Sequence, residues 1–306
     1  MAIAVSIVVV THRGVSELIR ACLTSLAASA DRNPMSTVVT IVVDNSSNPA
    51  VAAADYGPNV DEVLRVDNGG FGAAANAGIR LARQLSDAPV AVLNDDIEVG
   101  VDWLPPLLQA LRDDERVGAV QPALLRYGTE VINSLGVDLD RFAAGSDRGL
   151  DAPASSLDEA LTIDIFTGGA VLLRPEFLDA TGGFDDRYFL YYEDVDLALR
   201  GAELGWTYRC EVSSLVYHHG GATTAALGDD LLRYQERNRL LTATRFASPS
   251  TVGRAFWLSI RKLRHDPKGA HARALGGGLA GAPGALVRRI AASGRRRGAI
   301  VPADGG

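Results

Sequence analysis

The chain has 306 residues, of which 47% are hydrophobic, so it is long enough for one large domain with an appendage or for two ordinary domains. No apolar run reaches the roughly 18 to 20 residues that a bilayer-spanning helix needs, and two cysteines are too few for a disulfide framework. We therefore expect neither an integral membrane protein nor a disulfide-stapled domain, and we expect Cys22 and Cys210 to be ordinary buried thiols.

The net charge of −7 conceals a division along the chain. Residues 1–250 carry 19 basic and 35 acidic groups, whereas residues 251–306 carry 11 basic and 2 acidic groups. Because an acidic body repels phosphate backbones, we expect no nucleic-acid partner. The N-terminal segment is apolar but has no basic leader and no small-residue cleavage site, which predicts a first strand rather than a signal peptide, and hence a cytoplasmic protein.

Short apolar strands alternate with helical patterns through the first 120 residues. The expected strands cover residues 5–10, 38–43, 63–66, 90–93 and 117–120, and the expected helices cover residues 16–28, 72–85 and 103–112. Continuously apolar strands between helices predict a mostly parallel, Rossmann-like sheet that is covered on both faces. Polar clusters follow four of the strands, and in such sheets ligands bind where the strand ends meet.

Beyond residue 120 the pattern changes to shorter strand-like pieces joined by Gly- and Asp-rich loops. These are followed by a helix that begins near Glu193, a pair of strands at residues 206–210 and 214–217, and a long helix at residues 231–245. We found no internal repeat.

Three polar residues, Asn94, Asp95 and Asp96, directly follow an apolar strand. Carboxylates at a strand end can hold a hard divalent cation, which prefers oxygen ligands and bridges phosphates. Taken alone, the three residues are explained equally well by the turn chemistry of Asn and Asp.

Glu193 and Asp194 stand at the start of an amphipathic helix, just after a run of aromatic residues that includes Tyr191 and Tyr192. The helix dipole favours acidic residues in a first turn, which is one explanation for the pair. The other is catalysis, because aromatic rings stack on the C–H face of a sugar while a nearby carboxylate accepts a hydroxyl proton. A helix N-terminus would lower the pKa of that carboxylate and weaken it as a base.

His218 and His219 lie at a strand end before two glycines, in a chain with five histidines. Structural and metal-ligand roles both stay open, and an imidazole ligand suits Mn²⁺ better than Mg²⁺. Residues 70–75 also fit a dinucleotide-binding G-x-G-x-x-A pattern, but that pattern normally occupies the first strand-to-helix turn, which here is not glycine-rich. We therefore expect no NAD site.

Six segments in order resemble glycosyltransferase family 2, especially its bacterial rhamnosyltransferase-like branch with a GT-A fold. Within residues 5–224 they are SIVVVTHRG, IVVDNSS, DNGGFGAAANAG, VLNDDIEV, FTGGAVLLRPEFLDATGGFDDRYFLYYEDVDLALRGAELGW and VYHHGGAT. The resemblance implies an α/β GT-A domain with a nucleotide-sugar-binding half at residues 1–120 and an acceptor-binding, catalytic half at residues 121–250. Residues 251–306 lie beyond it, and we expect them to form a basic, helical and partly disordered C-terminal extension.

The resemblance also implies contacts to the nucleoside, diphosphate and sugar of a donor. The residues that match are Thr11, Arg13, Asp44, Asn45, Asn68, Gly70, Phe71, Asn76, Asn94, Asp95, Gly168 and Gly169. Asn94-Asp95-Asp96 is similar to the family's metal-binding DXD-type motif, with Asn in the first position. Asp96 and His218 are therefore the expected metal ligands.

The remaining roles concern the reaction itself. Asp194 matches the second acid of the family's Glu-Asp pair and would act as the catalytic base beside Glu193, while Tyr191 and Tyr192 would meet the acceptor. The implied reaction is a single in-line displacement that inverts the anomeric centre, assisted by a divalent metal, Mn or Mg.

The implied substrates are less sharply defined. A dTDP-rhamnose donor is favoured, and the acceptor is a hydroxyl of a glycan, a lipid-linked glycan of the cell envelope or a small molecule. A nucleotidyltransferase is an alternative, but it needs a basic phosphate-grasping loop, and Lys is absent from the first 250 residues. A catalytically inactive protein that binds glycans or nucleotide sugars is a second alternative. A homodimer stays open.

The tail has its own pattern. Four apolar residues, Trp257, Leu258, Ile260 and Leu263, are interspersed with four basic ones, Arg254, Arg261, Lys262 and Arg264. This predicts a basic amphipathic helix that rests on an anionic membrane surface, which would be the inner face of the plasma membrane. A packing helix with a solvated basic face, followed by a disordered end, is the alternative.

Overall fold

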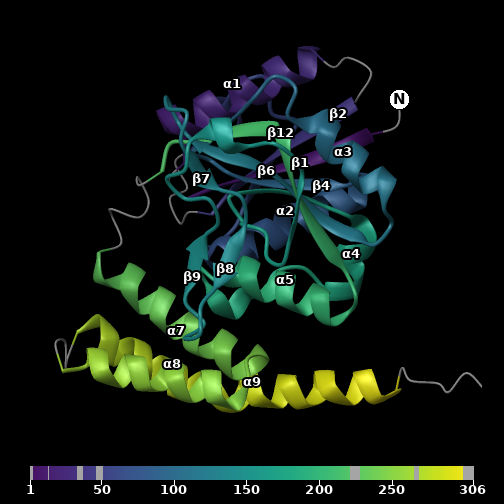
Figure 1. Cartoon of the computed structure of the whole chain (residues 1–306). Helices are drawn as coiled ribbons and strands as arrows, with labels where there is room; N and C mark the ends of the chain where they lie inside the picture. Colours follow the sequence, from purple (N-terminus) through teal and green to yellow (C-terminus); the bar gives the residue numbers. More distant parts are fainter. Residues whose placement is uncertain are drawn as a thin grey trace, which may run out of the picture. The chain divides into compact units, whose positions relative to one another are not determined.

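The computed structural model describes residues 3–12, 14–32, 37–45, 51–220, 228–264 and 269–298. The chain divides into two compact units (Figure 1). The first comprises residues 1–138 and 146–226, and the second comprises residues 139–145 and 227–306. The expected functional division at residues 120 and 250 stays a prediction, because compactness does not report which half binds which substrate.

The described part of the first unit is built on one mixed sheet. Its strands are β1 (Ile3–Thr11), β2 (Thr37–Asp44), β3 (Glu62–Arg65), β4 (Val90–Asn94), β5 (Ile97–Val99), β6 (Val117–Arg126), β7 (Ile132–Ser134), β10 (Leu161–Ile163), β11 (Ala170–Leu173) and β12 (Thr207–His218). The strand order is β10-β12-β6-β11-β4-β1-β2-β3, with β5 against β12 and β7 against β6. A separate hairpin joins β8 (Val137–Leu139) to β9 (Gly145–Asp147).

The sheet is mixed and mostly parallel, and β4, β1, β2 and β3 form the parallel block that was predicted. β1 pairs in parallel with β2 and β4, and β6 pairs in parallel with β12, while β11 runs antiparallel between β4 and β6. The prediction of two strands at residues 206–210 and 214–217 is wrong. Both segments belong to the single strand β12, whose register against β6 shifts between Glu211 and Leu215. The polar residues Glu211, Ser213 and Ser214 mark this irregularity and not a turn.

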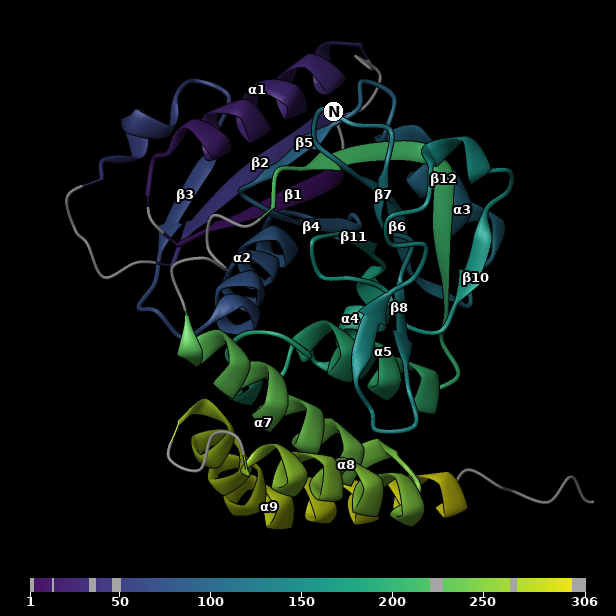
Figure 2. The ribbon, with the colours of Figure 1, turned by 60° about the vertical axis from the view of Figure 1, so that its left-hand side comes forward.

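Helices cover both faces of the sheet. They are α1 (Glu17–Arg32), α2 (Phe71–Leu85), α3 (Leu104–Asp113), α4 (Pro175–Thr181) and α5 (Glu193–Glu203). Alternate residues of a strand point to opposite faces. Accordingly Ile7 and Val9 belong to the core shared with α1 and α3, whereas Val8 lies next to α2 on the other face. Figure 2 shows α1 and α2 on opposite faces of the sheet.

The second unit is helical. α7 (Asp229–Phe246) packs against both α8 (Pro249–Lys262) and α9 (Ala270–Gly298). Its interior combines small apolar residues with an ionic cluster, in which the buried Arg239 guanidinium donates to Glu236 Oε2 at 2.7 Å and to Ser259 Oγ at 2.7 Å. The expected helical extension is thus present as α8 and α9, and residues 299–306 lie outside the described part.

Two expectations from composition can be compared with the structure. Cys22 and Cys210 are both buried free thiols, as predicted. Among the helices that the structure describes, none is long and apolar enough to cross a bilayer.

Candidate active site

The predicted donor-binding and metal-binding residues converge on one edge of the sheet. β1, β2 and β4 end at Thr11, Asp44 and Asn94, and the register pairs Thr11 with Asp44 and Val10 with Asn94. The ends of these parallel strands therefore lie side by side, as the sequence pattern predicted. Arg13 lies outside the described residues.

Asp44 lies at the end of β2 in an unusual environment. Its side chain is fully buried, and neither carboxylate oxygen has a hydrogen-bond partner among the described residues. The nearest cation is Arg65, whose Nε lies 3.9 Å from Oδ2. Tyr56, in the 3-10 turn Ala53–Tyr56, was missed by the sequence analysis. Burial, and next the charge of Asp44, raise the pKa of its hydroxyl, so it stays a neutral donor.

Thr11 and Asp95 contact each other across the strand ends. The Thr11 hydroxyl donates to Asp95 Oδ2 at 2.6 Å. Burial raises the pKa of Asp95, and the neighbouring Asp96 raises it further, while the Thr11 hydrogen bond opposes both. This side chain therefore already has a protein partner, unlike that of Asp44.

The loop before α2 packs against the aromatic segment before α5. Asn45 Nδ2 donates to Gly70 O at 3.1 Å, and the Gly70 amide donates to Asn68 Oδ1 at 3.2 Å. The Phe71 amide donates to Phe189 O at 2.7 Å. Gly70 has a φ of +91°, and a Cβ there would lie 2.1 Å from Phe189 O, so only glycine permits this approach.

Asn76 joins α2 to the loop that precedes α5. Its Nδ2 donates to Phe184 O and to Asp186 Oδ1, both at 2.8 Å, and its Oδ1 accepts from the Phe184 amide at 2.9 Å. The carboxamide is therefore committed to fastening the loop at residues 184–186 to α2. Direct contact of Asn76 with a donor stays a prediction.

The structure distinguishes the two adjacent histidines. His218 Nε2 lies 3.2 Å from Asp96 Oδ2, and its Nδ1 lies 2.7 Å from Asn133 Oδ1. His219 points elsewhere, with Nε2 2.7 Å from Glu98 Oε1 and its ring stacked on Tyr127 at 3.7 Å. The predicted pair of Asp96 and His218 thus comes together from β12 and the turn after β4.

The chemistry of this pair fits a divalent cation. Asp96 Oδ1 is buried without a hydrogen-bond partner among the described residues, so one oxygen is available to a ligand. Asn133 fixes the orientation of the His218 ring from behind, as partners of metal-bound histidines commonly do. Across the described part of the chain, no group of three or more His, Cys, Asp or Glu side chains is gathered for a metal.

Asp194 is held by two backbone amides. The Gly168 amide donates to its Oδ2 at 2.8 Å, and the Val195 amide donates to its Oδ1 at 2.8 Å. We expected a helix N-terminus to lower its pKa, and these amides do act in that direction. Burial outweighs them, however, and the pKa of Asp194 is raised. The carboxylate is therefore a stronger base than an ordinary aspartate.

Glu193 lies beside Asp194 and is buried, with 6% of its surface exposed. Its Oε2 has no hydrogen-bond partner among the described residues. Burial raises the pKa of Glu193, and the adjacent Asp194 raises it further. Both acids of this adjacent pair therefore hold a proton more tightly than ordinary carboxyl groups do.

A further acid, Asp147 at the end of β9, was missed by the sequence analysis. Burial raises the pKa of Asp147, and a hydrogen bond from Ser134 and the nearby His218 oppose this rise. The charge of Asp147 adds to the rise in the pKa of Asp194, so the three side chains Asp147, Asp194 and His218 lie in one electrostatic environment. Asp147 and Asn133 come from short strands in a Gly- and Asp-rich stretch, where no local pattern singles them out.

The loops that carry the remaining predicted residues are tightly constrained. The Gly169 carbonyl accepts a hydrogen bond from the Asn94 amide at 3.0 Å, which joins the residue before β11 to the end of β4. Tyr191 and Tyr192 are half-buried and have positive φ angles of 66° and 69°. Non-glycine residues rarely adopt such angles, and strained backbone often accompanies functional sites.

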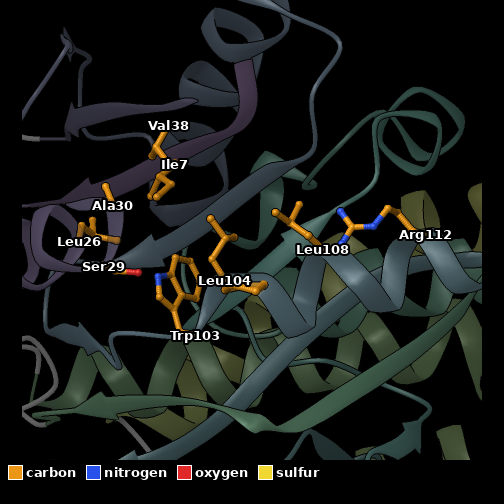
Figure 3. A pocket seen from close by; sticks show the side chains of 10 residues that line it. Ile7, Leu26, Ser29, Ala30, Val38, Trp103, Leu104, Leu108 and Arg112 are labelled. Atoms are coloured by element: carbon orange, nitrogen blue, oxygen red, sulfur yellow. The ribbon is translucent and has the colours of Figure 1, made fainter. Parts of the chain in front are cut away.

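A cavity of about 110 Å³ lies elsewhere among the helices and strands of the first unit, and Figure 3 shows the side chains that line it. It is enclosed by side chains of α1, β1, β2 and α3, including Ile7, Leu26, Ser29, Trp103, Leu104 and Arg112. Its walls are mostly apolar, and none of the predicted site residues lines it.

Sequence comparison shows what this chain is similar to. Residues 6–147 match the family described as glycosyl transferase family 2. An N-acetylglucosaminyl-diphospho-decaprenol L-rhamnosyltransferase of Mycobacterium tuberculosis is 28% identical over 223 residues, which cover 66% of this chain and 72% of the relative. The O-antigen biosynthesis protein RfbC of Myxococcus xanthus is 29% identical over 153 residues, 47% of this chain and 12% of that protein. These matches confirm the predicted resemblance.

Solved structures confirm the predicted fold class. GalNAc-T7, solved with UDP, GalNAc and Mn²⁺, aligns with a TM-score of 0.58 and 16% identity over 81% of this chain, which spans 52% of that longer chain. The mannosyltransferase PcManGT of Pyrobaculum calidifontis, solved with GDP-Man and Mn²⁺, aligns with a TM-score of 0.50 and 16% identity over 99% of this chain and 77% of its own. The first unit therefore has a GT-A-like fold.

Proposed function

We propose that the chain is a metal-dependent, inverting glycosyltransferase, because residues 6–147 match glycosyl transferase family 2. It takes a sugar from a nucleotide diphosphate donor and transfers it to a hydroxyl group. The observation that carries the proposal is the set of buried, unpaired acid oxygens at one edge of the sheet, on Asp44, Asp96 and Glu193. Such atoms are costly in a folded protein unless a ligand satisfies them.

The donor is bound through the strand ends. Asp44 accepts hydrogen bonds from the nucleoside, because the neighbouring Tyr56 hydroxyl and Arg65 guanidinium leave both of its buried oxygens without a close, well-aligned hydrogen bond. The Asn68–Gly70 segment leads into α2, and the backbone amides at the N-terminus of this helix favour anions. The diphosphate of the donor binds at this helix N-terminus. Thr11, Asn45, Asn94 and Asp95 shape the same edge.

Asp96 and His218 would hold the divalent cation, Mn or Mg, which when bound neutralises the charge that develops on the departing diphosphate. The fit rests on the free Asp96 oxygen and on the oriented imidazole. The Mn²⁺ bound by GalNAc-T7 and PcManGT supports this part of the proposal through the shared fold.

Asp194 removes the proton from the acceptor hydroxyl. Its two backbone hydrogen bonds fix the carboxylate in place, and its raised pKa makes it an effective base. Glu193 stays neutral beside it, which avoids a second buried negative charge. A single displacement from the face opposite the leaving diphosphate inverts the anomeric centre. Tyr191 and Tyr192, directly before α5, line the acceptor side.

Rhamnose from dTDP-rhamnose is the favoured donor, on the strength of the mycobacterial rhamnosyltransferase relative. Galactofuranose, glucose and N-acetylhexosamine donors come next. The name of the same relative favours a lipid-linked glycan acceptor, with a soluble small molecule as the competing acceptor. We place the reaction in the cytoplasm, at the inner face of the plasma membrane.

A panel of nucleotide sugars tests this function. A donor that binds only the folded state stabilises it by RT ln(1 + L/Kd), where L is the free donor concentration, so the unfolding temperature rises with the donor's affinity and concentration. We expect the largest rise with dTDP-rhamnose together with Mn²⁺ or Mg²⁺, and slow release of dTDP when no acceptor is present. Stabilisation without any release of nucleotide diphosphate, with or without acceptor, would indicate a binding protein. An absence of stabilisation by every nucleotide sugar would contradict the proposal.

A further inference from the structure

The solvent face of α8 combines aromatic, aliphatic and basic side chains. Trp257 and Ile260 are 53% and 56% exposed, although they are large and apolar. Arg254 and Arg261 lie on the same side of the helix, because residues three, four and seven apart share a face, and Arg264 is exposed in the turn that follows the helix. The Arg261 guanidinium lies 5.5 Å from the centre of the Trp257 ring. The opposite side of α8 packs through the buried residues Ala255 and Ser259.

The solvent face of α9 is apolar throughout its middle. Leu279, Leu286, Val287 and Ile290 are 56%, 49%, 65% and 63% exposed. Their spacing of seven, eight and eleven residues puts them on one side of the helix. Between residues 274 and 291, all of which the structure describes, the exposed residues are Gly276, Leu279, Ala280, Pro283, Gly284, Leu286, Val287, Ile290 and Ala291. None of them carries a charge, whereas α9 packs inward through Ala274 and Ala285.

The distribution of exposed and buried residues on α9 is the reverse of that on an ordinary surface helix. An ordinary surface helix buries its large aliphatic residues and exposes charged ones. Here small residues are buried and large aliphatic residues are exposed, so the apolar stripe needs a partner. Contiguous exposed apolar surfaces of this kind mark interaction sites.

The net positive charge of the second unit indicates which kind of partner the exposed apolar face binds. Residues 227–306 contain 15 basic and 5 acidic residues. Two copies of such a segment repel each other, whereas an anionic lipid surface attracts it. Trp beside Arg on α8 suits the boundary between headgroups and acyl chains, and the aliphatic stripe of α9 suits the acyl chains below.

We propose that α8 and α9 form a membrane-docking surface that lies flat on an anionic lipid leaflet. Its apolar part is Leu279, Leu286, Val287 and Ile290, and its interfacial part is Trp257, Ile260, Arg261 and Arg264. The structure narrows the expectation drawn from the sequence. Leu258 and Leu263 are only partly exposed, and Lys262 pairs with Glu236, so these three residues contribute to packing instead. The proposal stands apart from the transferase activity, because it requires no residue of the sheet edge.

Co-sedimentation of the full chain with lipid vesicles tests the proposal. Vesicles of phosphatidylglycerol and phosphatidylcholine are compared with vesicles of phosphatidylcholine alone, at low and at high salt. The apolar variant combines Leu279→Gln, Leu286→Gln and Ile290→Gln. Its control combines Leu85→Gln, Val101→Gln and Leu150→Gln, which change large apolar residues of the first unit that are 43%, 47% and 44% exposed. The basic variant combines Arg261→Gln with Arg264→Gln, and its control combines Arg20→Gln with Arg116→Gln.

We expect the wild type to bind the anionic vesicles and the apolar variant to lose binding by on the order of tenfold or more. The basic variant should bind about 25-fold more weakly at low salt, since each basic residue near such a surface contributes about a fivefold factor, and this difference should shrink at high salt. Both controls should bind like the wild type. Circular dichroism and donor-induced stabilisation verify that every variant is folded.

Three outcomes would overturn the proposal. The wild type could fail to bind anionic vesicles, which would mean that another part of the chain covers the apolar stripe. The apolar variant and its control could bind equally. The wild type could also behave as a dimer in light scattering while the apolar variant is a monomer, and this result would assign the stripe to a second copy of the chain.

Discussion

The two units depart from the usual rules of burial in opposite directions. In the first, carboxylate oxygens of Asp44, Asp96 and Glu193 are buried without partners among the described residues. In the second, large aliphatic side chains of α9 are exposed. An unpaired buried polar group costs about 1–3 kcal/mol, and exposed apolar surface costs roughly 25 cal/mol per Å². The difference indicates two tasks, one for a small polar ligand and one for an extended apolar surface.

Removing the base should have the largest effect. Asp194→Asn should lower kcat by about 10²- to 10⁴-fold, because the variant cannot accept the acceptor's proton. Donor affinity and vesicle binding should stay near wild type. Steady-state kinetics and donor titration measure both effects, with the exposed Asp179→Asn as a control. Near-normal turnover in Asp194→Asn would remove this residue from the mechanism.

The adjacent residues His218 and His219 provide the next test. His218→Ala should weaken metal-dependent donor binding by about 10- to 100-fold, because it removes the partner of Asp96. His219→Ala should have a much smaller effect, since that side chain pairs with Glu98. Donor titrations at several Mn²⁺ concentrations distinguish the two variants. Equal losses would show that the assignment of His218 alone is wrong.

Substitutions at two glycines distinguish the positioning of the Asp194 carboxylate from the stability of the fold. A Cβ at Gly168 would lie 3.3 Å from Asp194 Cβ and 3.4 Å from its Oδ2, so Gly168→Ala should displace the base and lower kcat by about tenfold. Gly182 has a φ of +77° and open space around its Cα. Gly182→Ala should therefore cost about 1 kcal/mol of unfolding free energy and leave kcat unchanged. The opposite result, with activity lost only in Gly182→Ala, would contradict this view of the site.

The smallest expected effect concerns stability and pH. Burial raises the pKa of Glu193 in the folded state, so the folded chain binds more protons than the unfolded chain. This group's contribution to stability is complete below its unfolded pKa of about 4.3 and is lost as the pH rises through the folded pKa. Glu193→Gln stays neutral and should be more stable than wild type at high pH, by about 1 kcal/mol or more. Urea unfolding between pH 5 and pH 9 measures this, and parallel curves for the two proteins would contradict it.

The sequence predicted the parts of the site that follow from strand order. Thr11, Asp44 and Asn94 end parallel strands, so their convergence needed only the alternation of strands and helices. The pairing of Asp96 with His218 joins residues far apart in the chain, and it was expected from the family resemblance. The choice between His218 and His219 was not predictable by periodicity, because the backbone at the end of β12 decides which ring faces inward.

Other features depend on packing that no local pattern encodes. The pKa of Asp194 was expected to fall, but desolvation by neighbouring elements outweighs the two amide hydrogen bonds. Tyr56 and Asp147 reach the site from a short 3-10 turn and a three-residue strand, which have too few residues for a periodic signal. β12 was mistaken for two strands because its irregularity near Glu211 has the composition of a turn.

The hairpin between β8 and β9 constrains how this protein can be taken apart. Its tip, residues 139–145, belongs to the second unit, where Ala143 is buried with Leu240 and the Phe142 carbonyl accepts from Arg239 at 2.7 Å. The polypeptide thus enters the helical unit, leaves it and returns after residue 226. A stop codon after residue 226 would delete α7, α8 and α9. The hairpin tip at residues 139–145 would then lose the helices against which it packs. Anyone who wants the sheet unit alone must shorten that hairpin in the same gene.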